Sequence, residues 1–256
     1  MLFGREYMPE GAGVDPDAPR KKGAARLLEI LSRDLDGIFL SGTLAMLACA
    51  PAAILAGIAL WLGSLPLCLL AAAAAGWLVG PALTSLYDTI LRALRDEPGF
   101  WWHTYKRVWK QSFKSSLVPG IVFTLLWTLV AYAAFVLPQL TTVSAGFALV
   151  LVVDMVLLLT LGSYYWMQNA LFETSLSQKL SNCVRMFLGF LPRTALSAAF
   201  QLGYWLLMAA VIPRCAFIFL LTGLWVPNLL AAMAVYAPVE KSLHLEEQIR
   251  AKQETN

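Results

Sequence analysis

Asp154 is the residue whose type and position offer this chain its clearest opportunity for chemistry. It lies in the middle of the apolar run Val143–Trp166, where a carboxylate costs about 2.5–3.5 kcal/mol to insert into a membrane. One interpretation is an ion or proton site, or a contact with a partner helix. The other is a structural carboxyl group bonded to a neighbouring helix, for which the candidate partners are Thr124, Thr128, Gln201, Tyr204 and Asn228.

No other group of residues has the spacing of a catalytic or metal site. His103 and His244 lie far apart, and neither has a Cys, His or carboxylate at ligand spacing. The four cysteines form no C-x-x-C pair and are typical of small buried side chains: Cys49, Cys68, Cys183 and Cys215. The chain also has no phosphate-binding loop, nucleophile elbow or zinc-protease motif. The sequence therefore predicts a non-enzymatic protein without a metal or cofactor.

The chain around Asp154 has the composition of an integral membrane protein. Its 256 residues have a mean hydropathy of +0.67 and only 14% of them are charged, against about 25% in soluble domains. Six apolar runs each approach the roughly 20 residues that cross a bilayer as a helix: Ile38–Leu62, Pro66–Leu94, Leu117–Leu137, Val143–Trp166, Thr194–Ile212 and Cys215–Tyr236. Short connections join them in pairs, so the predicted fold is an all-α membrane protein with six transmembrane helices arranged as three hairpins.

The basic residues predict the orientation of these helices. All but one of the 19 Lys and Arg residues lie before the first run, at the end of the second run, in alternate connections or after the last run, and only Arg214 lies on the opposite side. The positive-inside rule then places both termini in the cytoplasm. The predicted organisation is a polar Pro/Gly-rich arm at 1–23, a membrane domain at 24–240 and a cytoplasmic tail at 241–256.

The segment Trp101–Lys114 combines aromatic and basic residues. As a helix it has an aromatic face beside a cationic face, which suits a helix at the membrane surface. Ala24–Asp36 is a second predicted amphipathic helix on the same side. Because apolar runs adjoin both segments, the lipid bilayer rather than nucleic acid is the predicted partner. The predicted interfacial or docking residues are Trp101, Trp102, Tyr105, Lys106, Arg107, Trp109, Lys110 and Phe113.

Gly80 and Pro81 follow a run of alanines in the second apolar segment. Small residues let helix backbones approach closely in lipid, where helix association depends on packing. We therefore expect Gly80 and Pro81 to mark a helix–helix contact rather than a ligand loop.

Several short motifs resemble those of YesL-like bacterial membrane proteins. They are Phe3-Gly4-Arg5, Gly11–Val14, Arg20-Lys21-Lys22, Gly80–Leu83, Phe100–Phe113 and Leu191–Thr194, with Ala12 standing where the family pattern has Pro. The resemblance covers most of the chain. It implies a domain of unknown function in the bacterial plasma membrane, encoded beside carbohydrate ABC importers, and it implies no catalytic residue.

The connection 167–193 offers a second docking surface. Permease subunits of ABC importers carry a cytoplasmic loop that starts with Glu-Ala-Ala, ends near Leu-Pro and docks on the ATPase. Glu173 and Leu191-Pro192 have the same spacing here, although Lys179 replaces the Gly of that loop and chance similarity is the competing explanation.

Together with the resemblance, which implies the carbohydrate ABC importer, these features predict an accessory or assembly subunit of such an importer. Its expected partners are permease or ATPase subunits, or a second copy of the chain, because short outer loops and a large amphipathic inner surface suit docking better than substrate capture. The alternative is a stand-alone transporter or channel for small solutes, with Asp154 in its pathway.

Overall fold

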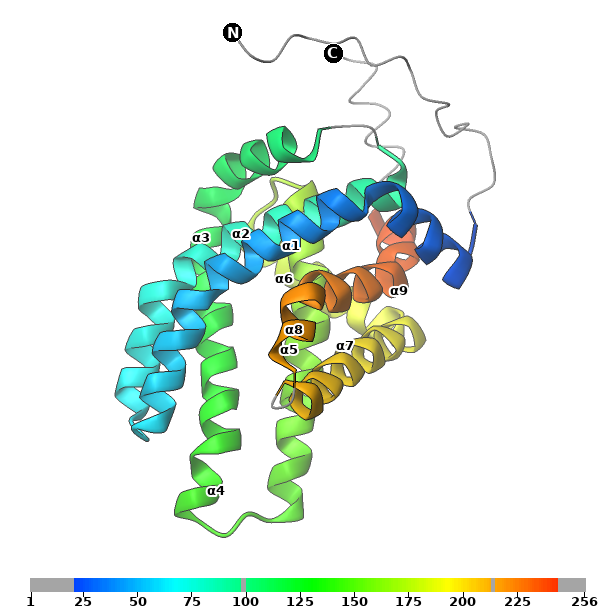
Figure 1. Cartoon of the computed structure of the whole chain (residues 1–256). Helices are drawn as coiled ribbons and strands as arrows, with labels where there is room; N and C mark the ends of the chain where they lie inside the picture. The colour runs from blue at the N-terminus through cyan, green and yellow to red at the C-terminus, as the bar shows by residue number, and fades with distance from the viewer. Residues whose placement is uncertain (1–20, 98–99, 213–214, 244–256) are drawn as a thin grey trace, which may run out of the picture.

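The computed structural model describes residues 21–97, 100–212 and 215–243, and all regular secondary structure in these ranges is helical (Figure 1). Most of the predicted N-terminal arm, Arg214 and most of the predicted tail lie outside the described residues. The helices are α1 (Ala24–Trp61), α2 (Leu65–Arg95), α3 (Trp101–Phe135), α4 (Leu137–Leu140), α5 (Ala145–Leu171), α6 (Leu176–Gly189), α7 (Leu191–Val211), α8 (Ala216–Thr222) and α9 (Trp225–Leu243).

Local sequence signals set several helix boundaries. The turn from α1 to α2 contains Gly63 at a positive φ of 65°, followed by a proline in the first turn of α2, where a missing N–H costs no helical hydrogen bond. The Ser144 hydroxyl accepts from the Phe147 N–H and caps α5. Ser175 and Gln178 form a reciprocal capping box that starts α6.

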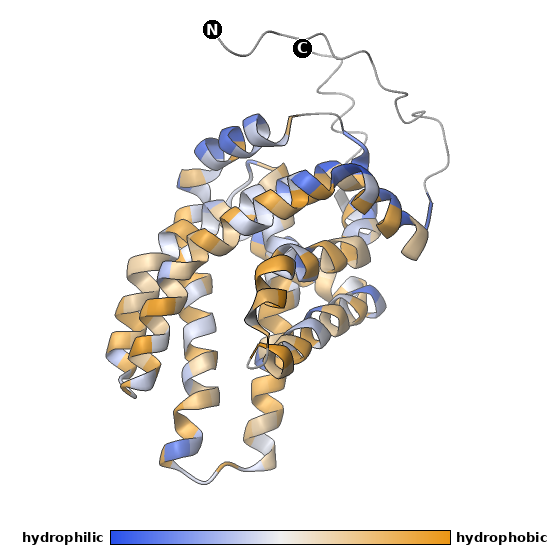
Figure 2. Ribbon diagram, in the orientation of Figure 1, coloured by the Kyte–Doolittle hydropathy of each residue, from blue (hydrophilic) through white to orange (hydrophobic). Residues whose placement is uncertain are grey.

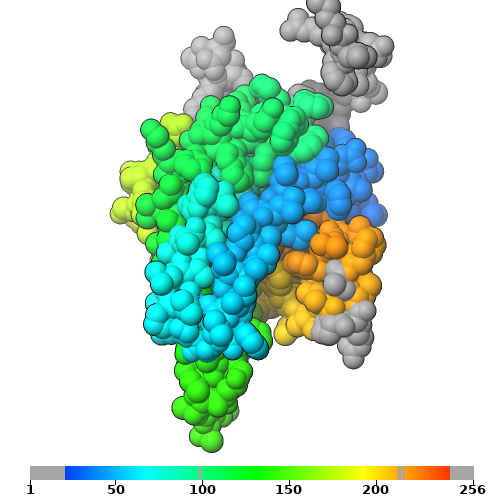
Figure 3. Space-filling model, turned by 60° about the vertical axis from the view of Figure 1, so that its left-hand side comes forward, coloured from blue at the N-terminus to red at the C-terminus, as the bar shows by residue number. Residues whose placement is uncertain are grey.

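The second half of helix α2, from Val79 to Leu94, is almost entirely buried. Helix α2 packs most extensively against α3 and α1 and also contacts α5 and α9, while α7 packs mainly on α9. Figure 3 shows α1 and α2 lying side by side on one face, with the tip of the α3–α5 hairpin projecting beyond them. More than half of the most apolar part of α2 is buried, against 17% for α1 and α5. The fold is therefore built around α2, and the outer helices leave apolar faces exposed.

Five of the helices that the structure describes are long and apolar enough to cross a membrane: α1, α2, α3 continued by α4, α5 and α7. They correspond within two residues to the first five predicted runs, so helices able to span a membrane are confirmed there by length and composition. The sixth predicted span, Cys215–Tyr236, is not confirmed as one helix, because it is divided into α8 and α9. The break falls at Gly223, whose φ of 45° and ψ of −142° are accessible to glycine and interrupt helical hydrogen bonding.

The two predicted amphipathic helices are not separate elements. Ala24–Asp36 is the first part of α1, and Trp101–Lys114 is the first part of α3. No break-forming backbone conformation separates either segment from its apolar run, so the helical hydrogen bonds continue. Of the predicted amphipathic connections, only 167–193 contains a helix of its own, α6.

Three glycines bring the backbones of α2 and α3 into contact. A Cβ atom on Gly120 would lie 2.6 Å from the Gly80 nitrogen and 2.8 Å from the Gly76 oxygen. A Cβ on Gly76 would lie 2.8 Å from the Ile121 Cα. Real Cβ atoms do not approach backbone this closely, so a side chain at any of these positions would push the helices apart. Gly80 thus lies where α2 and α3 approach most closely, and its neighbour Pro81 is buried within α2.

Replacing Gly80 with alanine should destabilise the fold. The added methyl group meets the backbone at Ser116, and overpacking of this kind costs about 1–3 kcal/mol. Thermal unfolding of the purified protein in detergent micelles measures the effect. Gly203→Ala is the matched control, because a Cβ at Gly203 in α7 meets nothing within 4 Å. Equal unfolding temperatures for both variants would contradict the tight contact.

Candidate functional site

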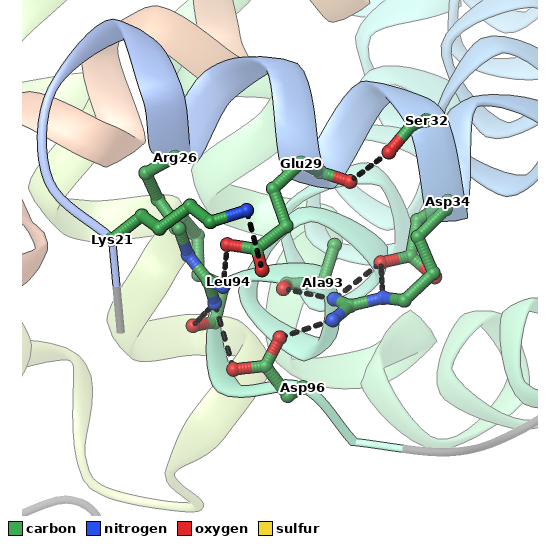
Figure 4. Close-up of polar contacts among 9 residues, drawn as sticks. Lys21, Arg26, Glu29, Ser32, Asp34, Ala93, Leu94 and Asp96 are labelled. Carbon is green, nitrogen blue, oxygen red and sulfur yellow. Dashed lines mark hydrogen bonds and ion pairs between the residues drawn. The ribbon is translucent and has the colours of Figure 1, made fainter. Parts of the chain in front are cut away.

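The hydrophilic residues gather at one end of the long helices (Figure 2). At this end the first turns of α1 meet the last turn of α2 through a cluster of ion pairs (Figure 4). Arg26 is buried, and it donates to Asp96 at 2.8 Å, to Glu29 at 2.9 Å and to the Leu94 carbonyl at 2.9 Å. Arg33 also donates to Asp96 and, at 2.9 Å, to the Ala93 carbonyl. Two cations of α1 therefore lie at the carboxyl end of α2.

This geometry stabilises the end of α2 in two ways. Helix α2 leaves its last carbonyls without intrahelical partners and carries partial negative charge there, and Arg26 and Arg33 supply both hydrogen bonds and positive charge. Burial alone raises the pKa of the Asp96 carboxyl, but hydrogen bonds from Arg26 and Arg33 outweigh it and hold that pKa below its usual 3.8. Asp96 therefore remains ionised and joins α1 to α2.

The predicted interfacial residues of α3 divide into two groups. Four of the aromatic residues are buried or half-buried against the protein: Trp101, Tyr105, Trp109 and Phe113. Trp101 packs on Gly37 of α1, and Phe113 makes an edge contact with Trp77 of α2. The exposed group consists of Trp102, Lys106, Arg107 and Lys110.

In the exposed group, the Lys106 ammonium lies 4.9 Å from the centre of the Trp102 ring, within the range of a cation–π interaction. The surface that α3 presents is therefore mainly cationic with one tryptophan. It can contact anionic headgroups, while most of the aromatic face contributes to internal packing.

Helix α6 is attached to the helix bundle by a buried lysine. Lys179 is 2% exposed, and its Nζ donates to Asn169 Oδ1 at 2.7 Å, while Asn169 Nδ2 donates to Thr84 Oγ1 at 2.8 Å. Burial lowers the pKa of Lys179 below its usual 10.5, and the nearby Glu173 carboxylate opposes this shift. This chain of contacts between α6, α5 and α2 could not be predicted from the sequence, because it depends on which helix faces meet.

The outer side of α6 exposes a stripe of apolar residues. Leu176, Leu180, Val184 and Leu188 follow one another at intervals of four residues and are 46–61% exposed. The opposite side of the helix is buried at Lys179, Cys183 and Met186. The predicted docking residues Glu173, Leu191 and Pro192 are exposed beside the two ends of α6.

A neutral polar cluster connects four helices in the interior. The Tyr87 hydroxyl of α2 donates to Asn228 Oδ1 of α9 at 2.8 Å and lies 3.0 Å from the Ser163 hydroxyl of α5. Gln201 Nε2 of α7 donates to the same Ser163 oxygen at 3.1 Å. Hydrogen bonds between uncharged groups thus link α2, α5, α7 and α9 where ions would be costly.

Asp154 is not part of this cluster. Its side chain is half-buried and has no hydrogen bond or ion pair with any residue that the structure describes. Its five predicted partners therefore do not bind it. Two of them, Gln201 and Asn228, belong to the interior cluster instead.

The described part of the chain contains few side chains placed for metal binding or thiol chemistry. No group of three or more His, Cys, Asp or Glu side chains there could hold a metal ion. Cys183 is buried beside Gln168, and burial raises the pKa of its thiol to about 12. Cys183 therefore stays protonated at neutral pH and is a poor nucleophile.

One family model matches part of the chain. The model described as "Protein of unknown function, DUF624" matches residues 55–133, which run from the second half of α1 through α2 into the last turns of α3. This match is consistent with the resemblance to YesL-like proteins. No curated protein and no solved structure matches the chain. The matched segment contains the glycine contact and the cationic surface of α3.

Replacing Asp96 with asparagine should remove a pH-dependent part of the stability. Asparagine tolerates the positive φ of 61° at this position, so the change removes charge with little backbone strain. At neutral pH we expect a loss of about 2 kcal/mol, typical of hydrogen bonds to charged groups. Because the folded pKa of Asp96 is lowered, its contribution is present above the unfolded pKa of about 3.9 and is lost as the pH falls through the folded pKa.

Unfolding temperatures of wild type and Asp96→Asn, measured in micelles from pH 7 to pH 3, test this expectation. The difference between the two should narrow as the pH falls below about 4. Asp36→Asn is the control, because exposed Asp36 has no ion pair among the described residues. A difference that stays constant with pH would show that Asp96 does not act through its charge.

Proposed function

We propose that this chain is a non-enzymatic membrane protein that serves as an accessory or assembly subunit of a carbohydrate ABC importer. In this proposal it lies in the bacterial plasma membrane with both termini in the cytoplasm. Its α6 surface docks on a cytoplasmic subunit or loop of the importer. The importer itself is suggested by the resemblance to YesL-like proteins.

The exposed stripe on α6 is the observation that carries this proposal. Four large apolar side chains lie outside the five helices that can span a membrane, and burying each of them fully would contribute about 1.5–3 kcal/mol. The capping box and the buried Lys179 hold α6 in place before any partner arrives. A preformed apolar surface of this kind is typical of a protein contact.

The polar residues of α6 favour a protein partner over lipid. Helices that bind anionic membrane surfaces carry many Lys and Arg residues on their polar face. On α6, Arg185 is the only exposed cation, because Lys179 is buried, and its other exposed polar side chains are uncharged. The cationic surface of α3 is better suited to headgroups, so the two surfaces have different roles in this proposal.

The proposal can be tested by purifying the tagged full-length protein from native membranes in mild detergent. Mass spectrometry should identify permease or ATPase subunits of a carbohydrate importer. The double variant Leu180→Ser/Leu188→Ser should lower their recovery at least tenfold. Leu28→Ser/Leu35→Ser is the matched control, because Leu28 and Leu35 are also exposed, on the first part of α1, and it should leave recovery unchanged.

Two results would contradict the proposal. The first is recovery of the wild-type protein without importer subunits, together with unchanged sugar uptake after deletion of its gene. The second is an α6 double variant that keeps the importer subunits at the wild-type level, because the stripe would then not be the docking surface.

A further inference from the structure

Two of the cavities in the described part of the chain differ in the charge of their linings. The larger, of about 510 Å³, lies between the membrane helices, and none of its lining residues is Asp, Glu, Lys, Arg or His. The smaller, of about 200 Å³, lies where α1, the end of α2 and the start of α3 meet, and we call it the charged pocket. Its lining includes Arg33, Asp34, Asp36, Arg92 and Glu97 but no residue of α6.

A close approach of three helices holds the charged pocket in place. A Cβ atom on Gly37 of α1 would lie 3.1 Å from the Trp101 Cβ of α3 and 3.9 Å from the Thr89 Cγ2 of α2. These three residues all line the pocket. Asp36 directly precedes Gly37, and Thr104 follows Trp101 by three residues on the same side of α3. Asp36 and Thr104 thus lie within about one helical turn of the point where the helices meet.

The ion pairs around the charged pocket are balanced without Asp36. Among the described residues, five cations there pair with five carboxylates: Lys21, Arg26, Arg33, Arg92 and Arg95 with Glu29, Asp34, Asp88, Asp96 and Glu97. The carboxylate of Asp36 lines the pocket but makes no hydrogen bond or ion pair with the described part of the chain. The pocket therefore carries one uncompensated negative charge, which attracts a cation and repels an anion.

A buried hydroxyl in the same lining also has no partner. Thr104 is 8% exposed, and its hydroxyl makes no hydrogen bond with any described residue, whereas the Thr89 hydroxyl donates to the Ser85 carbonyl at 3.0 Å. The Thr104 oxygen is not sealed off by protein atoms, and the residue lines the pocket. A buried hydroxyl that stays unbonded costs free energy, so a polar ligand in the pocket would offset that cost.

The remaining lining narrows the chemistry of this ligand. Phe100 and Trp101 add aromatic rings, whose faces attract cations. A metal ion is a poor candidate, because no group of three or more His, Cys, Asp or Glu side chains in the described part of the chain could hold one. An ammonium group suits the pocket better, since its N–H groups donate to carboxylate and hydroxyl oxygens.

We infer that the charged pocket binds the ammonium group of a small organic amine, with Asp36 as its counter-ion. A ligand that fills a pocket of about 200 Å³ contacts most of its walls, so it also meets the Thr104 hydroxyl. The ammonium group belongs either to a free amine or to the ethanolamine headgroup of a phospholipid. This site is independent of the docking surface on α6.

Unfolding temperatures of the purified full-length protein in micelles test the inference, because a ligand of the folded state raises them. Ethanolamine and choline are titrated at constant ionic strength in phosphate buffer, which contains no amine. The ammonium group of ethanolamine carries N–H donors, and that of choline carries none. Ethanolamine should reach its half-maximal shift at a concentration roughly two- to tenfold lower than choline, the range expected for one net hydrogen bond.

Two variants assign the binding to the charged pocket. Asp36→Asn should raise the half-maximal ethanolamine concentration about fivefold, the upper range for an exposed ion pair. Thr104→Val removes a hydroxyl without a partner, so it should leave the unfolding temperature without ligand unchanged and raise that concentration roughly two- to tenfold. Glu173→Gln is the matched control, because Glu173 is an exposed carboxylate outside the pocket, and it should leave the titration unchanged.

Short-chain phosphatidylethanolamine separates the two sources of the ammonium group. If the ligand is a lipid, dihexanoyl phosphatidylethanolamine should act at a lower concentration than free ethanolamine, and Asp36→Asn should weaken its effect. If the ligand is a free amine, ethanolamine should act at the lower concentration.

Equal titrations by ethanolamine and choline in the wild type would overturn the inference, because N–H donors would then make no difference. An ethanolamine titration that is the same in Asp36→Asn as in the wild type would also overturn it, because the amine would then bind outside the charged pocket.

Discussion

A charge in the hydrocarbon layer of a membrane needs a partner, a proton or access to water, and the arrangement of this chain follows from that constraint. With the exception of Asp154, the charged residues that the structure describes lie near the ends of the helices or in α6. Several of them form ion pairs there, as Arg26 and Arg33 do with Asp96. Deeper in the molecule, the helices are joined by neutral hydrogen bonds such as those of Tyr87 and Gln201.

The same constraint explains why small residues have such influence on the packing. Apolar side chains gain little by leaving lipid for protein, so helices in a membrane associate where their shapes fit closely. The glycines of α2 and α3 provide that fit on one side of α2, and the ion cluster fixes its carboxyl end against α1. The uncharged cavity is lined by α2 together with α1, α3, α5, α7 and α9.

Much of this architecture was predictable from composition, but which helix faces pack against each other was not. Runs of apolar residues predicted six spans, and five of them correspond to long apolar helices in the described part of the chain, because a membrane-spanning helix is a local property of about 20 residues. The break at Gly223 was missed, because hydropathy averaged over a run does not register one glycine in an unusual conformation. The continuity of Ala24–Asp36 with α1 was missed because a change from polar to apolar surroundings does not interrupt helical hydrogen bonds.

The contacts made by the candidate site residues could not be predicted from the sequence either. The alanine run and Gly80 indicated close packing, but Gly120 of α3 could not be identified as the partner from sequence. Lys179 looked like one more basic residue of a surface connection, yet it is buried against Asn169. Asp154 is an intramembrane carboxylate, but none of its five expected partners binds it: Thr128 makes no hydrogen bond among the described residues, and the other four bind different groups. These outcomes depend on contacts between residues far apart in the chain, which local patterns do not encode.

Labelling of single cysteines tests the central claim, that the helices cross a membrane with the charged end in the cytoplasm. In a variant without the four native cysteines, Thr141→Cys lies in the exposed turn before α5, and Lys110→Cys lies on the exposed cationic surface of α3. The account predicts that a membrane-impermeant maleimide labels Thr141→Cys in intact cells and labels Lys110→Cys only after permeabilisation. Labelling of Lys110→Cys in intact cells, or protection of Thr141→Cys, would contradict it.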